Sequence, residues 1–301
     1  MDFTRVLVLG ATGRLGGILR RCWGAEAAQW QSRRGAGPGW AEPGWAIFDP
    51  LQDSGALARA ARGATAILCL AGVTPARAGA GGEGAIGDMS DNTALAEAAI
   101  RAGAVSGARV FLTSSAAVYG NQAGFLDEAS PLLGQSAYGR AKADMESRGA
   151  ALGAELGVPV CALRIGNIAG ADAILGGWKP GFRLDRFADG HSPRRSYIGP
   201  VTLARVLGAL VVADELPAVL NIAAPGGVEM GALLDAAGLA WTAQPAPEAA
   251  IPEVVLSVRA LSAFVTLSAR DGLAQTLVDE WRDMSRQEGR PMNWPMNWTG
   301  R

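Results

Sequence analysis

Residues 5–16 read RVLVLGATGRLG, and this stretch decides the fold. Its first five residues form a short apolar run, as expected of a strand buried on both faces. In a dinucleotide-binding turn the first glycine permits the tight bend, the second lets a pyrophosphate approach the backbone, and the third lets the next helix pack closely. The amino terminus of that helix would face the phosphates with free N–H groups and a positive dipole end. We therefore expect cofactor contacts from the whole turn: Gly10, Thr12, Gly13, Arg14, Leu15 and Gly16.

Strand-like and helix-like segments alternate after this turn. We expect strands at residues 5–9, 27–32, 45–48, 66–70, 110–113, 158–163 and 218–221. We expect one helix that follows the glycine-rich turn and ends near residue 23, and further helices at 53–62, 88–102, 136–156, 201–212 and 274–284. A Gly- and Ala-rich stretch, 75–87, predicts a mobile loop. The alternation predicts an α/β fold, a Rossmann-like doubly wound parallel sheet with a small C-terminal substrate-binding lobe. We place an NAD(P)-binding domain at 1–165 and the partly interleaved lobe at 166–301.

The end of the second expected strand bears on the choice of cofactor. NAD sites usually place a carboxylate there to accept a hydrogen bond from the ribose 2′-OH. Residues 29–34 instead read QWQSRR, with no acid and two arginines. A guanidinium is permanently charged and can bind two phosphate oxygens at once. Arg33 and Arg34 therefore favour NADP(H) over NAD(H); the less favoured alternative is that they are solvated loop charges.

A tyrosine and a lysine four residues apart open the long helix expected at 136–156. Tyr138 and Lys142 fall on one helix face, so the phenol and the ammonium can point the same way. Tyrosine has a reference pKa near 10, and a nearby ammonium together with the positive nicotinamide would favour the phenolate. Ser115 ends a strand on the carboxyl side of the sheet, where ligands bind in such folds. These three residues predict a site that moves a proton and a hydride.

Four motifs resemble the extended short-chain dehydrogenase/reductase family, the NAD(P)-dependent epimerase/dehydratase group. They are GATGRLG at 10–16, SSAAVYG at 114–120, YGRAK at 138–142 and RIGNIAG at 164–170. The resemblance is nearly continuous to about residue 170. It implies that Tyr138 is the acid/base and that Lys142 holds the ribose and lowers the tyrosine pKa. It also implies cofactor contacts from Asp49, Leu70, Ala71, Gly72, Asn92, Ser114, Tyr138 and Lys142.

Departures from the family pattern narrow the chemistry. Sugar 4,6-dehydratases resembling this family carry an Asp-Glu pair directly after the active Ser or Thr, where this chain has Ala116 and Ala117. Enzymes that invert neighbouring carbons use an extra Cys and His, whereas His191, the single histidine, reads as a solvated loop residue. We therefore expect oxidation or reduction of one alcohol or ketone, or transient oxidation followed by inversion at that carbon.

The substrate side of the sequence is less specific. RRSYI at 194–198 resembles the family stretch whose arginine often meets a nucleotide-sugar diphosphate, and Arg195 is the matching position. The Asp and His of that stretch are replaced by Ser196 and Gly199. We expect Ser115, Asn167 and Arg195 to contact a sugar-like substrate. A small carbonyl or hydroxyl compound without a nucleotide competes with a nucleotide sugar.

Composition excludes several other classes of function. The chain has 301 residues, 49% hydrophobic and 18% charged, with a formal net charge of −1, so neither nucleic acid nor an anionic membrane is favoured as a partner. No apolar stretch approaches the roughly 18 residues that span a bilayer. The isolated cysteines at 22, 69 and 161 show no metal or disulfide spacing, and the last two read as buried, inert thiols. We expect a cytoplasmic protein with no metal and leave a homodimer open.

Two classes of function remain. The first is an NAD(P)-dependent oxidoreductase or epimerase acting on a hydroxyl or keto group of a sugar-like substrate. The second is a catalytically weak, NAD(P)-sensing regulator of the same fold. Such regulators typically lose the tyrosine or the lysine, and this chain keeps both. The sequence therefore favours the enzyme.

Overall fold

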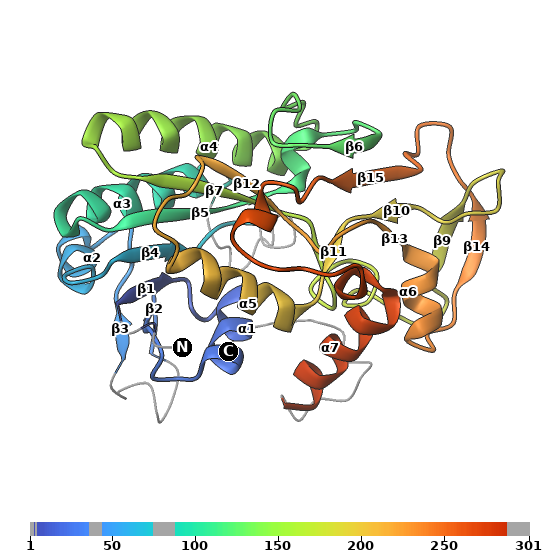
Figure 1. Cartoon of the computed structure of the whole chain (residues 1–301), viewed down its shortest axis with the longest axis horizontal. Helices are drawn as coiled ribbons and strands as arrows, with labels where there is room; N and C mark the ends of the chain where they lie inside the picture. The colour runs from blue at the N-terminus through green and yellow to red at the C-terminus, as the bar shows by residue number, and fades with distance from the viewer. Residues whose placement is uncertain (1–2, 4, 36–43, 75–87, 288–301) are drawn as a thin grey trace. The chain divides into compact units, whose positions relative to one another are not determined.

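The computed structural model describes residues 3, 5–35, 44–74 and 88–287 (Figure 1). The chain divides into two compact units, which are described separately. The first unit comprises Met1–Gly120, Pro131–Arg164 and Leu207–Leu220, and the second comprises Asn121–Ser130, Ile165–Val206 and Asn221–Arg301. The loop predicted at 75–87 lies outside the described residues.

A seven-stranded sheet forms the centre of the first unit. Its strands, in spatial order, are β12 (Val219–Ile222), β7 (Val160–Ile165), β5 (Arg109–Ser115), β4 (Ala66–Cys69), β1 (Val6–Leu9), β2 (Gln29–Ser32) and β3 (Trp45–Ile47). Neighbouring strands from β5 to β3 pair in parallel. The chain enters the sheet at β1, moves outward to β3 and then returns past β1 to β4. This reversal of strand order confirms the predicted doubly wound fold.

Helices connect these strands because parallel neighbours need a crossover. They are α1 (Arg14–Trp23), α2 (Ser54–Ala60), α3 (Asp91–Ser106), α4 (Ala137–Leu156) and α5 (Pro200–Val211), with a short 3₁₀ turn η1 (Ala116–Tyr119) after β5. Figure 1 shows α1 on the opposite side of the sheet from α3 and α4. Helices on both faces explain why β1 and β4 are apolar at every position and fully buried.

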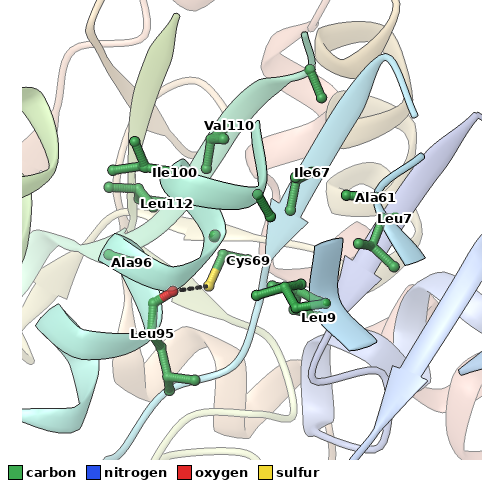
Figure 2. Packing of buried hydrophobic residues seen from close by; sticks show 14 of the residues in the cluster. Leu7, Leu9, Ala61, Ile67, Cys69, Leu95, Ala96, Ile100, Val110 and Leu112 are labelled. Atoms are coloured by element: carbon green, nitrogen blue, oxygen red, sulfur yellow. Dashed lines mark hydrogen bonds between the residues drawn. The ribbon is translucent and has the colours of Figure 1, made fainter. Parts of the chain in front are cut away.

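The core beneath α2, α3 and α4 contains Cys69 (Figure 2). Its Sγ lies 3.9 Å from the carbonyl oxygen of Leu95 in α3. Burial raises the pKa of this thiol to about 11, and burial raises that of Cys161 to about 12. Both thiols stay protonated at neutral pH, and their predicted burial is confirmed.

The second unit contains short strands that the sequence pattern did not predict. They are β6 (Gly124–Leu126), β8 (Asn167–Ile168), β9 (Arg183–Arg186), β10 (Arg194–Arg195), β11 (Tyr197–Ile198), β13 (Val228–Glu229), β14 (Thr242–Pro245) and β15 (Glu253–Leu256). They form one four-stranded sheet, β13-β10-β15-β6, and two strand pairs, β11-β8 and β14-β9. This unit also contains α6 (Met230–Ala236), α7 (Ala274–Gln287), the 3₁₀ turns η2 (Leu261–Ala263) and η3 (Ala269–Gly272), and the first part of α5, up to Val206.

Apolar side chains from α6 and α7 close the core of the second unit. Leu233, Leu277 and Val278 are fully buried there, and Trp281 packs beside them.

Glu280, one residue before that tryptophan, accepts hydrogen bonds from the backbone N–H of Thr202 at 2.9 Å and from its hydroxyl at 2.6 Å. The first of these bonds satisfies a first-turn N–H of α5 that has no partner within the helix.

None of the helices in the described part of the chain is both long and apolar enough to cross a membrane. The same residues contain no cluster of His, Cys, Asp and Glu that could hold a metal ion.

Candidate active site and cofactor pocket

The glycine-rich turn between β1 and α1 is built by close backbone contacts. Gly10 has a φ of +80°, a conformation that side chains rarely adopt, and a Cβ there would lie 2.7 Å from the backbone of Ala71. At Gly16 a Cβ would lie 2.4 Å from the carbonyl oxygen of Ala11, so α1 packs directly against the turn. Two of the glycines predicted from the sequence are therefore required by geometry.

The amino terminus of α1 opens directly after this turn. The helix begins at Arg14, with Gly13 as its N-cap and no hydrogen bond from a capping side chain. Its first turn contains no acidic residue. Because first-turn N–H groups have no partner within the helix, they are suited to an anion such as a pyrophosphate.

A pocket at the carboxyl ends of β1, β2 and β4 brings together eight of the residues predicted to bind the cofactor. These are Gly10, Thr12, Gly13, Arg33, Asp49, Leu70, Ala71 and Gly72. Its lining also contains residues that the sequence did not single out: Gln31, Ser32, Pro50, Leu51, Val73, Asp91 and Leu95. The backbone cradle, the open helix terminus and the mixed polar and apolar walls fit a dinucleotide.

Gln31 is the most informative of the residues that were missed. Its side chain is fully buried at the end of β2. Oε1 accepts a hydrogen bond from the N–H of Gly10 at 2.9 Å, and Nε2 donates to the carbonyl oxygen of Phe48 at 2.5 Å. One amide therefore ties the glycine-rich turn to the residue after β3. The sequence offered only one signal for this role, a polar side chain within an expected buried strand.

The two arginines after β2 differ in their surroundings. Arg33 is exposed and lines the pocket, whereas Arg34 is exposed and is not part of the lining. The backbone of Arg34 is fixed by Ser32, whose hydroxyl donates to the carbonyl oxygen of Arg34 at 2.8 Å. Asp49, on the next strand connection, also lines the pocket.

Asn92 is buried at the start of α3 and holds the segment after β4. Its Oδ1 accepts from the N–H of Val73 at 3.1 Å, and its Nδ2 donates to the carbonyl oxygen of Val73 at 3.2 Å. Gly72 lies so close to this amide that a Cβ there would be 2.7 Å from Oδ1 and 3.3 Å from Lys142 Nζ. Three of the predicted residues, Gly72, Asn92 and Lys142, therefore meet at one place.

Helix α4 starts where a capping serine allows it. The hydroxyl of Ser136 accepts from the N–H of Gly139 at 2.9 Å, which satisfies a first-turn donor. Tyr138 thus lies in the first turn, and its phenol hydrogen-bonds to the hydroxyl of Ser115 at the end of β5. Ser115 also caps η1 by accepting from the N–H of Ala117 at 3.2 Å.

The pKa of the phenol differs from the sequence expectation both in its direction and in the groups that affect it. Burial raises the pKa of Tyr138 above its ordinary value, while the hydrogen bond to Ser115 and the charge of Arg14 lower it. Lys142 Nζ lies 5.8 Å from the centre of the tyrosine ring and donates to the carbonyl oxygen of Thr113 at 2.8 Å. We expected Lys142, together with the nicotinamide, to lower this pKa, whereas the lowering comes from Ser115 and Arg14 and is outweighed by burial.

Lys142 is itself strongly perturbed. Burial lowers its pKa from 10.5 to about 8, against the opposing effects of Cys69 and Glu146. At neutral pH the ammonium is still the main form, so a buried positive charge lies beside Tyr138. Ser114 is buried as well, and its hydroxyl donates to Glu146.

The two predicted substrate-side residues other than Ser115, Asn167 and Arg195, lie in the second unit. Asn167 opens β8 and donates to the carbonyl oxygen of Ser196 at 3.3 Å. The guanidinium of Arg195 donates to three backbone carbonyls, including that of Ile251 at 2.8 Å. Part of its hydrogen-bonding capacity is therefore used by the backbone just before β15. His191 is exposed, as expected, with Nδ1 at 2.8 Å from Glu229.

Comparisons with known proteins give one family and many solved structures. The model of the family described as NAD dependent epimerase/dehydratase matches residues 6–180, more than half of the chain. None of the curated proteins compared matches. A UDP-N-acetylglucosamine 4-epimerase from Methanobrevibacter ruminantium has a TM-score of 0.72 at 17% identity, covering 95% of this chain and 100% of that one.

Two further solved structures carry NAD. A UDP-glucose 4-epimerase from Thermus thermophilus is 20% identical, with a TM-score of 0.68, covering 92% of this chain and 98% of that one. A dTDP-glucose 4,6-dehydratase from Streptomyces venezuelae is 22% identical, with a TM-score of 0.67, covering 94% of this chain and 98% of that one. At these identities the likeness shows a shared fold.

Proposed function

Because this chain belongs to the NAD-dependent epimerase/dehydratase family, we propose that it oxidises or reduces one hydroxyl or keto carbon of a sugar-like substrate through Ser115, Tyr138 and Lys142. Inversion at that carbon, by oxidation and re-reduction, is part of the same proposal. The observation that carries it is the arrangement on α4: a partly buried phenol, hydrogen-bonded to a serine at the carboxyl end of β5, with a buried ammonium on the same helix face.

Each side chain has a distinct part in this reaction. Ser115 holds the substrate oxygen, and Tyr138 gives a proton to it or takes one from it. Lys142 keeps a positive charge beside the phenol and holds the ribose of the cofactor. A bound nicotinamide dinucleotide supplies the hydride acceptor or donor. Gly10, Gly13 and the first turn of α1 hold its pyrophosphate, and Asp49 meets its adenosine end, with further cofactor contacts proposed from Ser114 and residues 70–72.

The cofactor we propose is NADP(H) in preference to NAD(H). Arg33 is exposed on the pocket wall directly after β2, and the carboxylate typical of NAD sites is absent from residues 29–34. A hydrogen bond to a charged group contributes about 1.5–3 kcal/mol, less where the group is wet. A preference of about tenfold follows, since about 1.4 kcal/mol is a factor of ten. Arg33→Ala should remove most of it, while Arg34→Ala, outside the pocket lining, is the matched control.

Nucleotide sugars are the substrates we place first. The three solved structures described above are of enzymes named for UDP- or dTDP-linked sugars, and Asn167 and Arg195 occupy the substrate-side motifs of this chain. Ala116 and Ala117 follow the active serine, so we propose no elimination of water. A sugar-like compound without a nucleotide is the alternative substrate.

A substrate panel tests the proposal. The purified protein is first examined for the absorbance of retained nicotinamide and then incubated with NADP⁺ or NADPH and UDP- and dTDP-sugars. Net change in reduced nicotinamide identifies a reductase or dehydrogenase, and interconversion of epimers with retained cofactor identifies an epimerase. Dinucleotide binding without turnover of any alcohol or ketone would instead favour the sensing regulator.

A further inference from the structure

One face of α4 contacts the end of β5 at three successive points. Tyr138, Lys142 and Glu146 are spaced by four residues and therefore lie on one side of the helix. Their partners are the consecutive strand residues 113–115: the phenol meets the hydroxyl of 115, the ammonium meets the carbonyl of 113, and the carboxylate meets the hydroxyl of 114. The first two contacts belong to the proposed catalytic set, whereas Glu146, which makes the third, has no assigned role.

The carboxylate of Glu146 also anchors the next strand. It accepts from Arg164 at the end of β7, with Nε at 3.1 Å from each oxygen and Nη2 at 2.7 Å from Oε2. Nη1 of the same arginine donates to the hydroxyl of Tyr119 in η1 at 3.0 Å. The two charged side chains are 5% and 6% exposed. One buried ion pair thereby joins α4, β5, β7 and the turn that follows the active serine.

Stability alone does not explain this pair. Replacing a buried ion pair by well-packed apolar residues is often neutral or stabilising, because desolvation opposes the attraction between the charges. Hydrophobic side chains would fill the interface between α4 and the sheet equally well. What a carboxylate adds is a directional acceptor for Ser114, the residue next to the serine that meets the phenol.

We propose that Glu146 is a positioning residue for this active site, one that fixes the serine-bearing end of β5 against the Tyr138–Lys142 face of α4. The proposal rests on the function proposed above. It assigns Glu146 no contact with substrate or cofactor. Small misplacements of reacting groups are costly, and an error of 1 Å can lower the rate about a hundredfold.

Glu146 has a second effect through its charge. Lys142 faces Tyr138 and Glu146 on its own helix and Cys69 on β4, and the negative charge of Glu146 raises the pKa of Lys142 against the lowering caused by burial. Removing that charge should let the ammonium lose its proton at lower pH. A role limited to packing would not produce this change.

The experiment compares Glu146→Gln with Glu155→Gln, an exposed glutamate on the same helix that serves as the control. Ser114→Ala is the second test, because it removes the contact to β5 while leaving the ion pair intact. NADPH affinity and turnover of an accepted sugar are measured against pH for the wild type and all three variants.

We expect Glu146→Gln to lower turnover by about tenfold to a hundredfold. The pH above which NADPH affinity falls, its alkaline limit, should move to a lower value. Ser114→Ala should lower turnover tenfold or more without moving that limit, and Glu155→Gln should match the wild type. Turnover within threefold of wild type in both test variants, with an unchanged alkaline limit, overturns the proposal. If Glu146→Gln fails to fold, Ser114→Ala decides by the same threshold, and a loss of turnover supports the proposal only where its NADPH affinity matches the wild type, because a cofactor contact is also proposed for this serine. Failure of the wild type to bind or turn over would count against the proposed function instead.

Discussion

Replacing Lys142 by methionine should reveal how much stability the buried ammonium costs. Burial holds its folded pKa at about 8 against an ordinary 10.5, a gap of about 2.5 pH units, or about 3 kcal/mol at about 1.4 kcal/mol per unit. Between these two values the unfolded chain carries the proton and the folded chain does not. Wild-type stability therefore rises with pH through this window, and methionine removes that rise.

Urea unfolding at several pH values measures the effect. The free energy of unfolding of Lys142→Met minus that of the wild type should fall by about 3 kcal/mol between pH 7 and pH 11, because other titrating groups cancel in the difference. Lys179→Met, at an exposed lysine, is the matched control and should show a constant difference. Methionine should also weaken NADPH binding and turnover while folding is retained.

Parallel curves for the wild type and Lys142→Met would refute this reasoning. They would mean that the ammonium is solvated in the folded protein and that its 2.8 Å contact with the carbonyl oxygen of Thr113 does not reflect a buried charge.

Three other substitutions test individual contacts. Gln31→Leu should lower dinucleotide affinity by about tenfold or more, because the N–H of Gly10 loses its buried acceptor; isothermal titration measures it, and unchanged affinity would remove the glutamine from the site. Gly16→Ala should cost about 1–3 kcal/mol of unfolding free energy, because the new methyl would lie 2.4 Å from the oxygen of Ala11; urea titration that shows no loss would contradict the close packing of α1. Glu280→Ala should cost about 1–3 kcal/mol by leaving two first-turn donors of α5 without their acceptor, and an unchanged midpoint in thermal unfolding would count against that cap.

The sheet of the first unit could be predicted because its signal is local. β1 and β4 are short apolar runs bounded by turn residues, and each is followed by a helix pattern. The two-residue strands β8, β10, β11 and β13 carry no periodicity of their own. Their pairing is decided by partners far away in sequence, such as Arg194 opposite Glu229 and Glu253. The second unit therefore could not be drawn from the sequence pattern.

The same distinction, between local sequence signals and contacts decided by distant residues, applies to the candidate site. Ser115, Tyr138 and Lys142 could be predicted as a catalytic set because their chemistry is tied to motifs of fixed spacing, and the structure brings them together. Gln31 and Glu146 were missed because the role of a buried amide or carboxylate depends on which backbone or arginine the fold brings to it. For Glu146 one signal was present in the sequence, since it continues the four-residue spacing of Tyr138 and Lys142.

The most direct test of the central claim is the single-turnover rate of hydride transfer in Tyr138→Phe and in the wild type, with an accepted sugar and saturating cofactor. Phenylalanine removes the phenolic hydroxyl and leaves the cofactor pocket intact. A well-placed acid/base contributes about 10²–10⁴-fold, so we predict a rate lower by that factor at nearly unchanged cofactor affinity. A rate within threefold of the wild type would contradict it.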